Sequence, residues 1–307
     1  MDVLRAAAKE APAAPGVYFL LAGDGELVYI GKAIDLRRRL AQHARAAETG
    51  ATPKDVRRGA TVATVRWEVH ASGDAAADRE ADLVVALGPG LNASMTAEGR
   101  WSTIVVDDST AGIVVSVARE APPAVRGRRV YGCFPHLGVG MSSPRGIACS
   151  EGYAALTRLL WSATVADASH RMPAPICGPS PAAVATVGPL GAFGKGLHRL
   201  LSGASSGVLP MLLAAATGAR PPLEHPALRR DAEGAEAFFR HGPAALRDLR
   251  RRHAIRTRVV DRDRWRTALL DELRASIGDF VAPAVDDPTG GILGPRLARE
   301  YAVRRRR

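Results

Sequence analysis

Residues 16–32 decide the fold of the first part of this chain, and they read GVYFLLAGDGELVYIGK. Two apolar runs flank the turn sequence Ala-Gly-Asp-Gly at 22–25, a pattern that predicts a β-hairpin. The hairpin places Tyr18 and Tyr29 on facing strands, where they can share one face of a sheet. Two such phenols can also be ordinary core residues, so the pair alone assigns no function.

The segments after the hairpin complete a small α/β (α+β) unit. Alternation of apolar and polar residues predicts a third strand, and two helical patterns lie on either side of it. The order β-β-α-β-α therefore predicts one domain over residues 1–98. Its expected elements are strands 16–21, 26–30 and 61–70, a helix from the N-cap Asp35 to about residue 48, and a helix 75–87.

The rest of the chain divides by composition into a strand-containing connector, 99–125, a mainly helical, loop-rich region, 126–303, and a basic tail, 304–307. Pro122-Pro123 marks a linker. The expected elements are one or two strands within 101–117 and helices near 152–166, 197–204, 207–218, 226–253 (interrupted) and 262–277.

No basic start followed by an apolar run opens the chain, and the apolar stretch 207–219 is too short to span a bilayer. We therefore expect a cytoplasmic protein with no membrane partner. Cys133, Cys149 and Cys177 form no CxxC pair, so neither a zinc nor an Fe–S motif is supported. Reduced thiols, mostly buried, are expected.

The net charge of +11 lies outside the first 100 residues, which hold 13 basic and 13 acidic side chains. Such an excess favours a polyanionic partner, and nucleic acid is the expected one. The alternative is that a GC-rich genome simply encodes Arg in place of Lys. Nine Arg and three Asp fall in 247–266, which makes Arg250, Arg251 and Arg252 candidate DNA contacts. A solvated helical face is the equal alternative.

The helix after Asp35 carries an apolar stripe that begins at Leu36. On a helical wheel, Arg39 and His43 lie beside this stripe, one turn apart, and so at the edge of the core. Arg37 and Arg38 point away from it and are either solvated or directed at phosphate.

Glu80 falls within the apolar stripe of the expected helix 75–87. A carboxylate on a buried face is costly unless it is paired, protonated or bound to a metal. It is therefore either a metal ligand or a partner in an ion pair with Arg39 or another basic group. A set of two phenols, a lysine, an arginine, an imidazole and one acid suits phosphodiester hydrolysis with a single Mg²⁺.

At these residues the chain resembles the GIY-YIG nuclease superfamily, whose name motifs appear as Gly16-Val17-Tyr18 and Tyr29-Ile30-Gly31. Within it, the chain is most similar to the N-terminal half of UvrC, the excision-repair endonuclease subunit, and its short homologues. The resemblance covers roughly residues 12–95 and implies a three-stranded antiparallel sheet.

The resemblance implies a role for each matching residue. Tyr29 is the first candidate for the general base and Tyr18 the second, and Arg39 stabilises the phosphorane charge. Glu80 holds one Mg²⁺ or Mn²⁺. Lys32 and His43 position water and phosphate, and Gly16, Gly31 and Asn92 are structural. Leu91 departs from the family, which usually has tyrosine there.

The implied function is a metal-dependent DNA endonuclease with a repair role of the nucleotide-excision type, without an Fe–S cluster. UvrA- or UvrB-type proteins are possible partners. The alternatives are a non-catalytic nucleic-acid-binding repair scaffold and a restriction- or homing-type nuclease. Intact Tyr18, Tyr29, Arg39 and Glu80 disfavour the scaffold, and no zinc finger or helix-turn-helix pattern supports the nuclease with its own sequence specificity.

Overall fold

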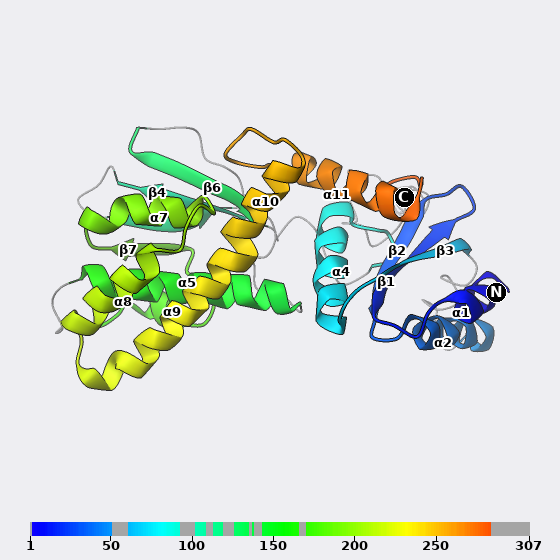
Figure 1. Cartoon of the computed structure of the whole chain (residues 1–307), viewed down its shortest axis with the longest axis horizontal. Coiled ribbons are helices and arrows are strands. Elements are labelled where there is room, and N and C mark those ends of the chain that lie inside the picture. The colour runs from blue at the N-terminus through cyan, green and yellow to red at the C-terminus, as the bar shows by residue number, and fades with distance from the viewer. Residues whose placement is uncertain are drawn as a thin grey trace, which may run out of the picture. The chain divides into compact units, whose positions relative to one another are not determined.

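The computed structural model describes residues 2–50, 61–92, 102–108, 113–118, 126–134, 137, 143–165 and 170–283. The chain forms two compact units (Figure 1). The first contains Met1–Glu98 and Asp263–Arg307, and the second contains Gly99–Arg262. The tail 304–307 and Pro122-Pro123 lie outside the described residues.

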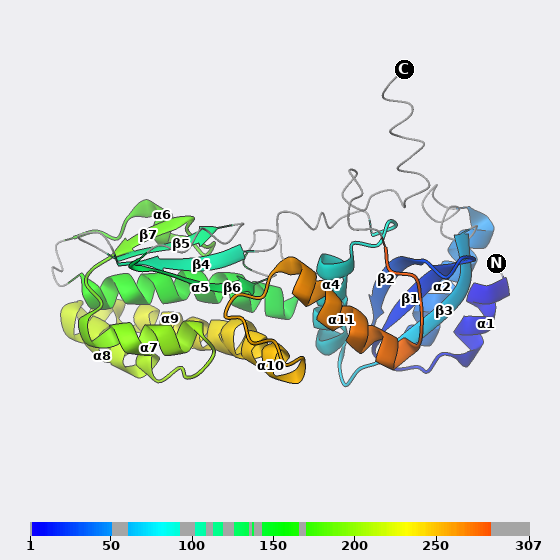
Figure 2. The ribbon, with the colours of Figure 1, turned by 90° about the horizontal axis from the view of Figure 1, so that it is seen from above.

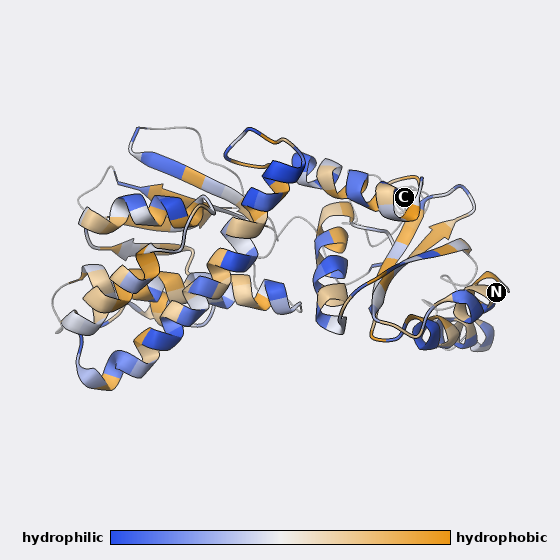
Figure 3. Cartoon of the chain, viewed as in Figure 1, coloured by the Kyte–Doolittle hydropathy of each residue, from blue (hydrophilic) through white to orange (hydrophobic). Residues whose placement is uncertain are grey.

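A three-stranded antiparallel sheet forms the centre of the first unit, as the sequence predicted. The strands are β1 (Gly16–Ala22), β2 (Leu27–Ala33) and β3 (Val62–Val69), in the order β2-β1-β3. The central strand β1 is buried almost throughout, and the apolar colour of β1 and β2 in Figure 3 reflects this. Tyr18 pairs with Gly31, and Leu20 pairs with Tyr29, so the two tyrosines lie diagonally on one face.

Two predicted helices pack against this sheet. Helix α2 (Leu36–Thr49) begins where the Asp35 side chain accepts a hydrogen bond from the backbone N–H of Arg38, at 2.9 Å. Helix α4 (Gly73–Leu87) begins with Ser72 as its N-cap and ends at Gly88 in the left-handed conformation. Helix α2 starts directly after the predicted N-cap Asp35, and α4 starts at Gly73 rather than at residue 75 as expected.

The first unit contains two further helices that the sequence prediction did not place there. Helix α1 (Asp2–Glu10), absent from the sequence prediction, buries Leu4 and Ala7 in a core cluster shared with α2 and β1. Helix α11 (Arg262–Ile277) was predicted as a helix but grouped with the second region. It packs on the first unit, so the chain returns there after residue 262.

The second unit is mostly helical, as predicted, but it also contains a four-stranded antiparallel sheet. The strand order is β6-β4-β5-β7, and the two strands of the expected connector form its centre. The two strands within the connector 99–125 each pair with a strand from the region after residue 125, so strands from both regions form one sheet. The strands are β4 (Ser102–Asp107), β5 (Ile113–Ala118), β6 (Arg128–Phe134) and β7 (Val184–Val187).

Most predicted helices of the second unit are present, but α5 begins at Pro144 rather than near residue 152, and α6 was not predicted. Helices α5 and α9 approach closely where Gly152 meets Gly234. This approach requires glycine at position 152, because a Cβ there would overlap the carbonyl oxygen of Gly234. A turn of π-helix, Arg240–Ala244, contains Pro243 and causes the predicted interruption before α10. The helices are α5 (Pro144–Thr164), α6 (Ala174–Cys177), α7 (Gly194–Leu201), α8 (Val208–Ala219), α9 (His225–Phe239) and α10 (Ala245–Arg252).

In the part of the chain that the structure describes, no helix combines the length and the apolar character needed to cross a membrane.

The Asp35 cap yields a stability prediction, because it fixes the start of the helix that carries Arg39 and His43. Asp35→Ala should lower the free energy of unfolding by about 1 kcal/mol, since it leaves the N–H of Arg38 without its acceptor. Asp35→Asn keeps an acceptor oxygen and should stay close to wild type. Urea unfolding of both variants tests this, and equal loss in both would exclude the cap as the cause.

Candidate active site

The two tyrosines of the hairpin lie together because a glycine faces them. Their ring centroids are 5.9 Å apart, and Tyr18 is completely buried whereas Tyr29 is partly exposed. A Cβ on Gly31 would overlap the Tyr18 hydroxyl and lie 2.7 Å from the Tyr29 ring. Glycine at this position is therefore a steric requirement of the tyrosine pair.

His43 reaches the same point from α2, as the helical wheel predicted. The Tyr18 hydroxyl and His43 Nε2 share a hydrogen bond of 2.6 Å, and His43 is itself buried. Tyr29 and Arg39 lie close enough to the Tyr18 hydroxyl to influence its pKa. Burial is the main cause that raises the pKa of Tyr18 well above its ordinary value, and the neighbouring phenol of Tyr29 raises it further. Arg39 acts in the opposite direction and lowers the pKa. Tyr18 is therefore a neutral phenol at the centre of a hydrogen-bonded group.

Arg39 lies at the exposed rim of this group. Partial burial acts to lower its pKa, but two phenols and the Glu80 carboxylate outweigh burial and raise the pKa. Its guanidinium also donates to the Gln42 side chain at 3.3 Å. A cation held in this way is available to an anionic substrate.

Glu80 projects from α4 toward β2 and forms an ion pair with Lys32 at 3.2 Å. The sequence left open whether Glu80 pairs with Arg39 or with another basic group, and the structure shows that its partner is Lys32. The side chain of Glu80 is 19% exposed and that of Lys32 is 41% exposed, so the pair lies at the surface of the site. A carboxylate that is reachable from solvent, and whose cationic partner can swing away, fits a hard divalent cation.

Asn92 binds the outer edge of β2, the strand that carries Tyr29 and Lys32. Its side-chain oxygen accepts from the backbone N–H of Ile30 at 2.9 Å, and its nitrogen donates to the carbonyl of Ile30 at 2.6 Å. Gly16, at the start of β1, allows another close approach, because a Cβ there would overlap the carbonyl oxygen of Glu68. Both residues therefore hold the frame of the site and bring no reactive group to it.

The candidate DNA-contacting arginines fall into two groups. Arg37 and Arg38 are exposed on α2, but Arg37 Nε donates to the carbonyl of Ala11 at 2.9 Å, which gives it a structural role.

The other group, Arg250, Arg251 and Arg252, ends α10 in the second unit. The last two both pair with Asp248, at 2.7 and 3.1 Å. Their hydrogen bonds lower the pKa of Asp248. Such exposed pairs are weak, so phosphate can displace the carboxylate.

Sequence reasoning missed a charged cluster behind α4. Arg79 binds Glu68 of β3 through Nε and a second nitrogen, at 3.0 and 3.1 Å, and binds Glu272 of α11 at 3.1 Å. The position of Arg79 next to Glu80 was visible in the sequence. The partner 193 residues away was not, because no local pattern encodes it.

Cys133 and Cys149 are buried and Cys177 is exposed, and none of the three forms a disulfide. Over the described residues, no group of three or more His, Cys, Asp or Glu side chains is arranged to hold a metal ion.

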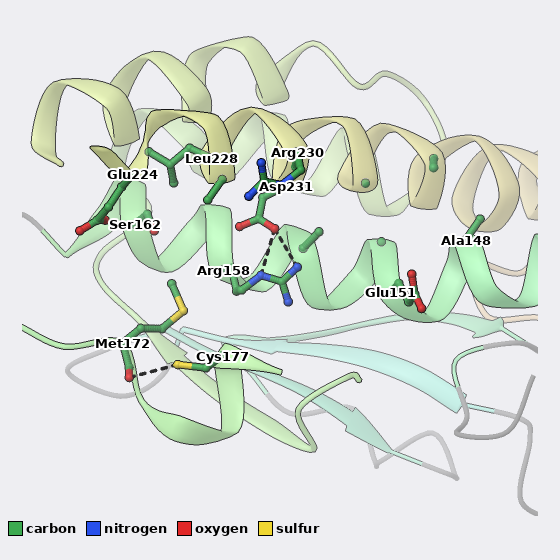
Figure 4. Close-up of a pocket in the computed structure, with 15 residues that line it drawn as sticks. Ala148, Glu151, Arg158, Ser162, Met172, Cys177, Glu224, Leu228, Arg230 and Asp231 are labelled. Atoms are coloured by element: carbon green, nitrogen blue, oxygen red, sulfur yellow. Dashed lines mark hydrogen bonds and ion pairs between the residues drawn. The ribbon is translucent and has the colours of Figure 1, made fainter. Parts of the chain in front are cut away.

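A cavity of about 620 Å³ lies between α5, α9 and α6 in the second unit. Figure 4 shows Arg158 of α5 directed at Asp231 of α9, with which it forms an ion pair at 2.7 Å. Arg158 also donates to the carbonyl of Gly178 at 2.6 Å. Arg158 and Asp231 thus compensate each other, and none of the catalytic candidates lines the cavity.

Comparison with known proteins agrees with this geometry. Residues 14–93 match the family model of the UvrC-like GIY-YIG domain. The UvrABC system protein C of Nitrosomonas europaea is 29% identical over 139 residues, which cover 43% of this chain and 21% of that relative. The match thus spans about one fifth of the relative's length. Residues 14–93 are a UvrC-like GIY-YIG nuclease domain, as the motifs predicted.

Solved structures of similar sequence come from Thermotoga maritima UvrC. Its GIY-YIG N-terminal endonuclease domain, bound to magnesium as its catalytic divalent cation, is 30% identical, with a TM-score of 0.27. The similarity covers 30% of this chain and 98% of that one. A point mutant of that domain is 31% identical, with a TM-score of 0.24, and the similarity covers 27% and 88% of the two chains.

The Arg79 cluster predicts how stability depends on pH. Burial acts to raise the pKa of Glu68, but the hydrogen bonds and charge of Arg79 hold it below its usual 4.5. A folded-state pKa below the unfolded value adds stability above pH 4.5, and this stability is lost as the pH falls through the folded pKa. Glu68→Gln should therefore cost about 1–3 kcal/mol at pH 7, and the difference from wild type should shrink toward pH 3.

Urea unfolding at both pH values measures this effect. Glu233→Gln, at an exposed position in α9, is the control and should change little at either pH. If the loss of unfolding free energy in Glu68→Gln stays constant down to pH 3, the lowered pKa of Glu68 does not contribute to stability as predicted.

Proposed function

We propose that this chain, which carries a UvrC-like GIY-YIG domain over residues 14–93, is a metal-dependent DNA endonuclease that incises damaged DNA. One observation carries the proposal: six side chains from two strands and two helices converge at one end of the small sheet. They are Tyr18, Tyr29, Lys32, Arg39, His43 and Glu80.

Tyr29 is the better candidate for the general base. It is partly exposed, so a water molecule poised to attack phosphorus can reach it, whereas Tyr18 is completely buried. The ring centroids of Tyr29 and Tyr18 lie 5.9 Å apart, and the Tyr18 hydroxyl shares a hydrogen bond with His43 Nε2. As the water proton moves to Tyr29, Tyr29 would pass its own phenolic proton to Tyr18, and Tyr18 would pass its proton to His43 Nε2.

Arg39 stabilises the charge that develops on the phosphoryl oxygens. It stands next to both phenols and carries a full positive charge, which its surroundings favour further. An arginine placed in advance at such a point lowers the barrier because no reorganisation is needed during the reaction.

Glu80 is the protein ligand proposed for one Mg²⁺ or Mn²⁺. Bound there, the cation would act as a Lewis acid toward a phosphoryl oxygen. A single carboxylate suits Mg²⁺, which keeps several waters and takes further oxygens from phosphate. Lys32, now paired with Glu80, would then be free to hold the phosphate.

The remainder of the chain supplies affinity for the duplex in this proposal. Net positive charge resides outside the first 100 residues, and neutralisation of phosphates dominates non-specific DNA binding. Arg250, Arg251 and Arg252 are the proposed contacts in α10, with Arg38 near the site. Proteins of the UvrA and UvrB type are proposed partners, on the strength of the UvrABC relative.

Cleavage of supercoiled plasmid, plain or lesion-bearing, tests the activity. Wild-type protein should nick DNA only with Mg²⁺ or Mn²⁺, and Glu80→Gln should lose at least about 100-fold, because the amide carries no charge for the cation. Arg39→Ala should lose about 100- to 1,000-fold. The charge-matched control Asp74→Asn, at an exposed position on the same helix, should cleave normally. Absence of any metal-dependent cleavage by wild type would favour the non-catalytic scaffold.

The two tyrosines should respond differently to loss of the hydroxyl. Tyr29→Phe should lower kcat by about 100- to 10,000-fold and leave stability unchanged. Tyr18→Phe should also lower the free energy of unfolding, by about 1–3 kcal/mol, because it removes a buried hydrogen bond. Single-turnover cleavage and urea unfolding of both variants separate these effects. Full activity in Tyr29→Phe would transfer the role of base to another group.

A further inference from the structure

The segment 263–283 lies against the nuclease domain although it follows the whole second unit in sequence. Helix α11 passes across α4, and the two helices lie next to each other in both Figure 1 and Figure 2. The segment falls outside the matched residues 14–93, so the family match assigns no role to it. Three sets of contacts join it to the domain.

The first contact is the charged cluster at the N-terminal half of α4. Arg79 lies between the carboxylates of Glu68 and Glu272, and all three side chains are at least three-quarters buried. Glu68 takes two nitrogens of the guanidinium and Glu272 takes the third. A planar guanidinium held on two sides has one orientation, and this orientation fixes the rotation of α4 about its axis.

The second contact is at the C-terminal end of α4. Arg266, a buried residue of α11, donates to the carbonyls of Ala86 and Leu87, both at 3.3 Å. It also donates to the carbonyl of Pro283. The last carbonyls of a helix have no partner within the helix, and a cation there also opposes the negative end of the helix dipole. Arg266 therefore caps α4 from outside the matched domain.

The third contact ties the end of the segment to the sheet. Arg66 of β3 donates to the carbonyls of Ile277 and Asp279, at 2.5 and 2.8 Å. The backbone N–H of Leu27 donates to Val281, and the N–H of Val281 donates to Gly25, at 3.0 and 2.9 Å. Residue 281 thereby extends the hairpin, and α11 is anchored at its far end.

These contacts bear on Glu80 because it directly follows Arg79 on α4. Adjacent helical side chains point about 100° apart, so Arg79 faces β3 and α11 while Glu80 faces Lys32 on β2. A rotation of α4 by about 10° would move a side-chain tip, roughly 6 Å from the axis, by about 1 Å. A displacement of that size is enough to impair a catalytic geometry.

We propose that Glu272 and Arg266 are positioning residues, which set the rotation and the end of α4 and thereby the place of the Glu80 carboxylate. The inference rests on the proposed function for its catalytic consequence, but the mechanical link between α11 and α4 can be tested without cleavage. The segment 263–283 thus completes the nuclease site that residues 14–93 begin.

The test uses the full chain with Glu272→Gln and its matched control Asp271→Asn, one residue away on the exposed face of α11. In the metal-free protein, Glu272→Gln should speed hydrogen exchange of α4 amides by about tenfold and leave β1 unchanged. Titration with Mn²⁺ alone should show about tenfold weaker binding, the scale on which outer-sphere partners of a metal ligand act. Asp271→Asn should match wild type in both measurements.

A second variant keeps the test independent of folding. Arg266→Lys retains one charge but not the forked geometry, and should raise exchange at the C-terminal end of α4 more than at its start. Nicking by Glu272→Gln should fall in kcat, with KM for DNA unchanged.

Unchanged α4 exchange and Mn²⁺ affinity in Glu272→Gln would overturn the positioning role, and so would a uniform rise in exchange over the whole first unit. Absence of cleavage by wild type would instead overturn the proposed function. A local change in α4 exchange would then still show that α11 holds this helix.

Discussion

The site depends on the register of one strand pair, in which Tyr18 of β1 faces Gly31 of β2. Because Gly31 has no side chain, two phenol rings can occupy the space above it. Tyr29, His43 and Arg39 all lie near the buried Tyr18 hydroxyl as a result. A shift of one residue would turn these side chains to the other face of the sheet. Asn92 secures this arrangement from outside, since its amide binds both backbone groups of Ile30 on the edge strand.

Helix α4 carries Glu80, the acidic residue of the site, to the basic residues on β2 and α2. The same helix presents Glu80 to Lys32 of β2 and Arg79 to β3 and α11, so it joins the site to the structure that supports it. Behind the helix, Arg79 is shared between two carboxylates, and His70 Nε2 also lies 3.4 Å from Glu68, whereas Lys32 compensates Glu80 at the front. The front pair is the more exposed of the two, and it is the one that a phosphate and a cation would have to separate.

Much of the candidate site was predictable because its residues lie in regular elements. Strand alternation placed the tyrosines, helical periodicity placed Arg39 and His43 at the edge of the core, and the misfit of Glu80 in an apolar stripe marked it out. The partner of Glu80 was not predictable, since both Arg39 and Lys32 were available. Strand β6 begins with two arginines, and β7 has four residues in a stretch rich in Pro and Ala, so neither has a clear strand pattern. Each is defined by the neighbour that it pairs with.

The amino-acid sequence by itself determined the hairpin, the caps at Asp35 and Gly88, the order of elements in the first domain and the set of reactive residue types. These are local properties, set by backbone conformations and side-chain periods over a few residues. The tertiary structure alone decided that Glu80 pairs with Lys32, that strands of the expected connector form the centre of a second sheet, and that α11 returns to cap α4. Those contacts join residues that are tens to hundreds of positions apart, and their energy arises from burial and complementary charge between surfaces that exist only after each element has formed.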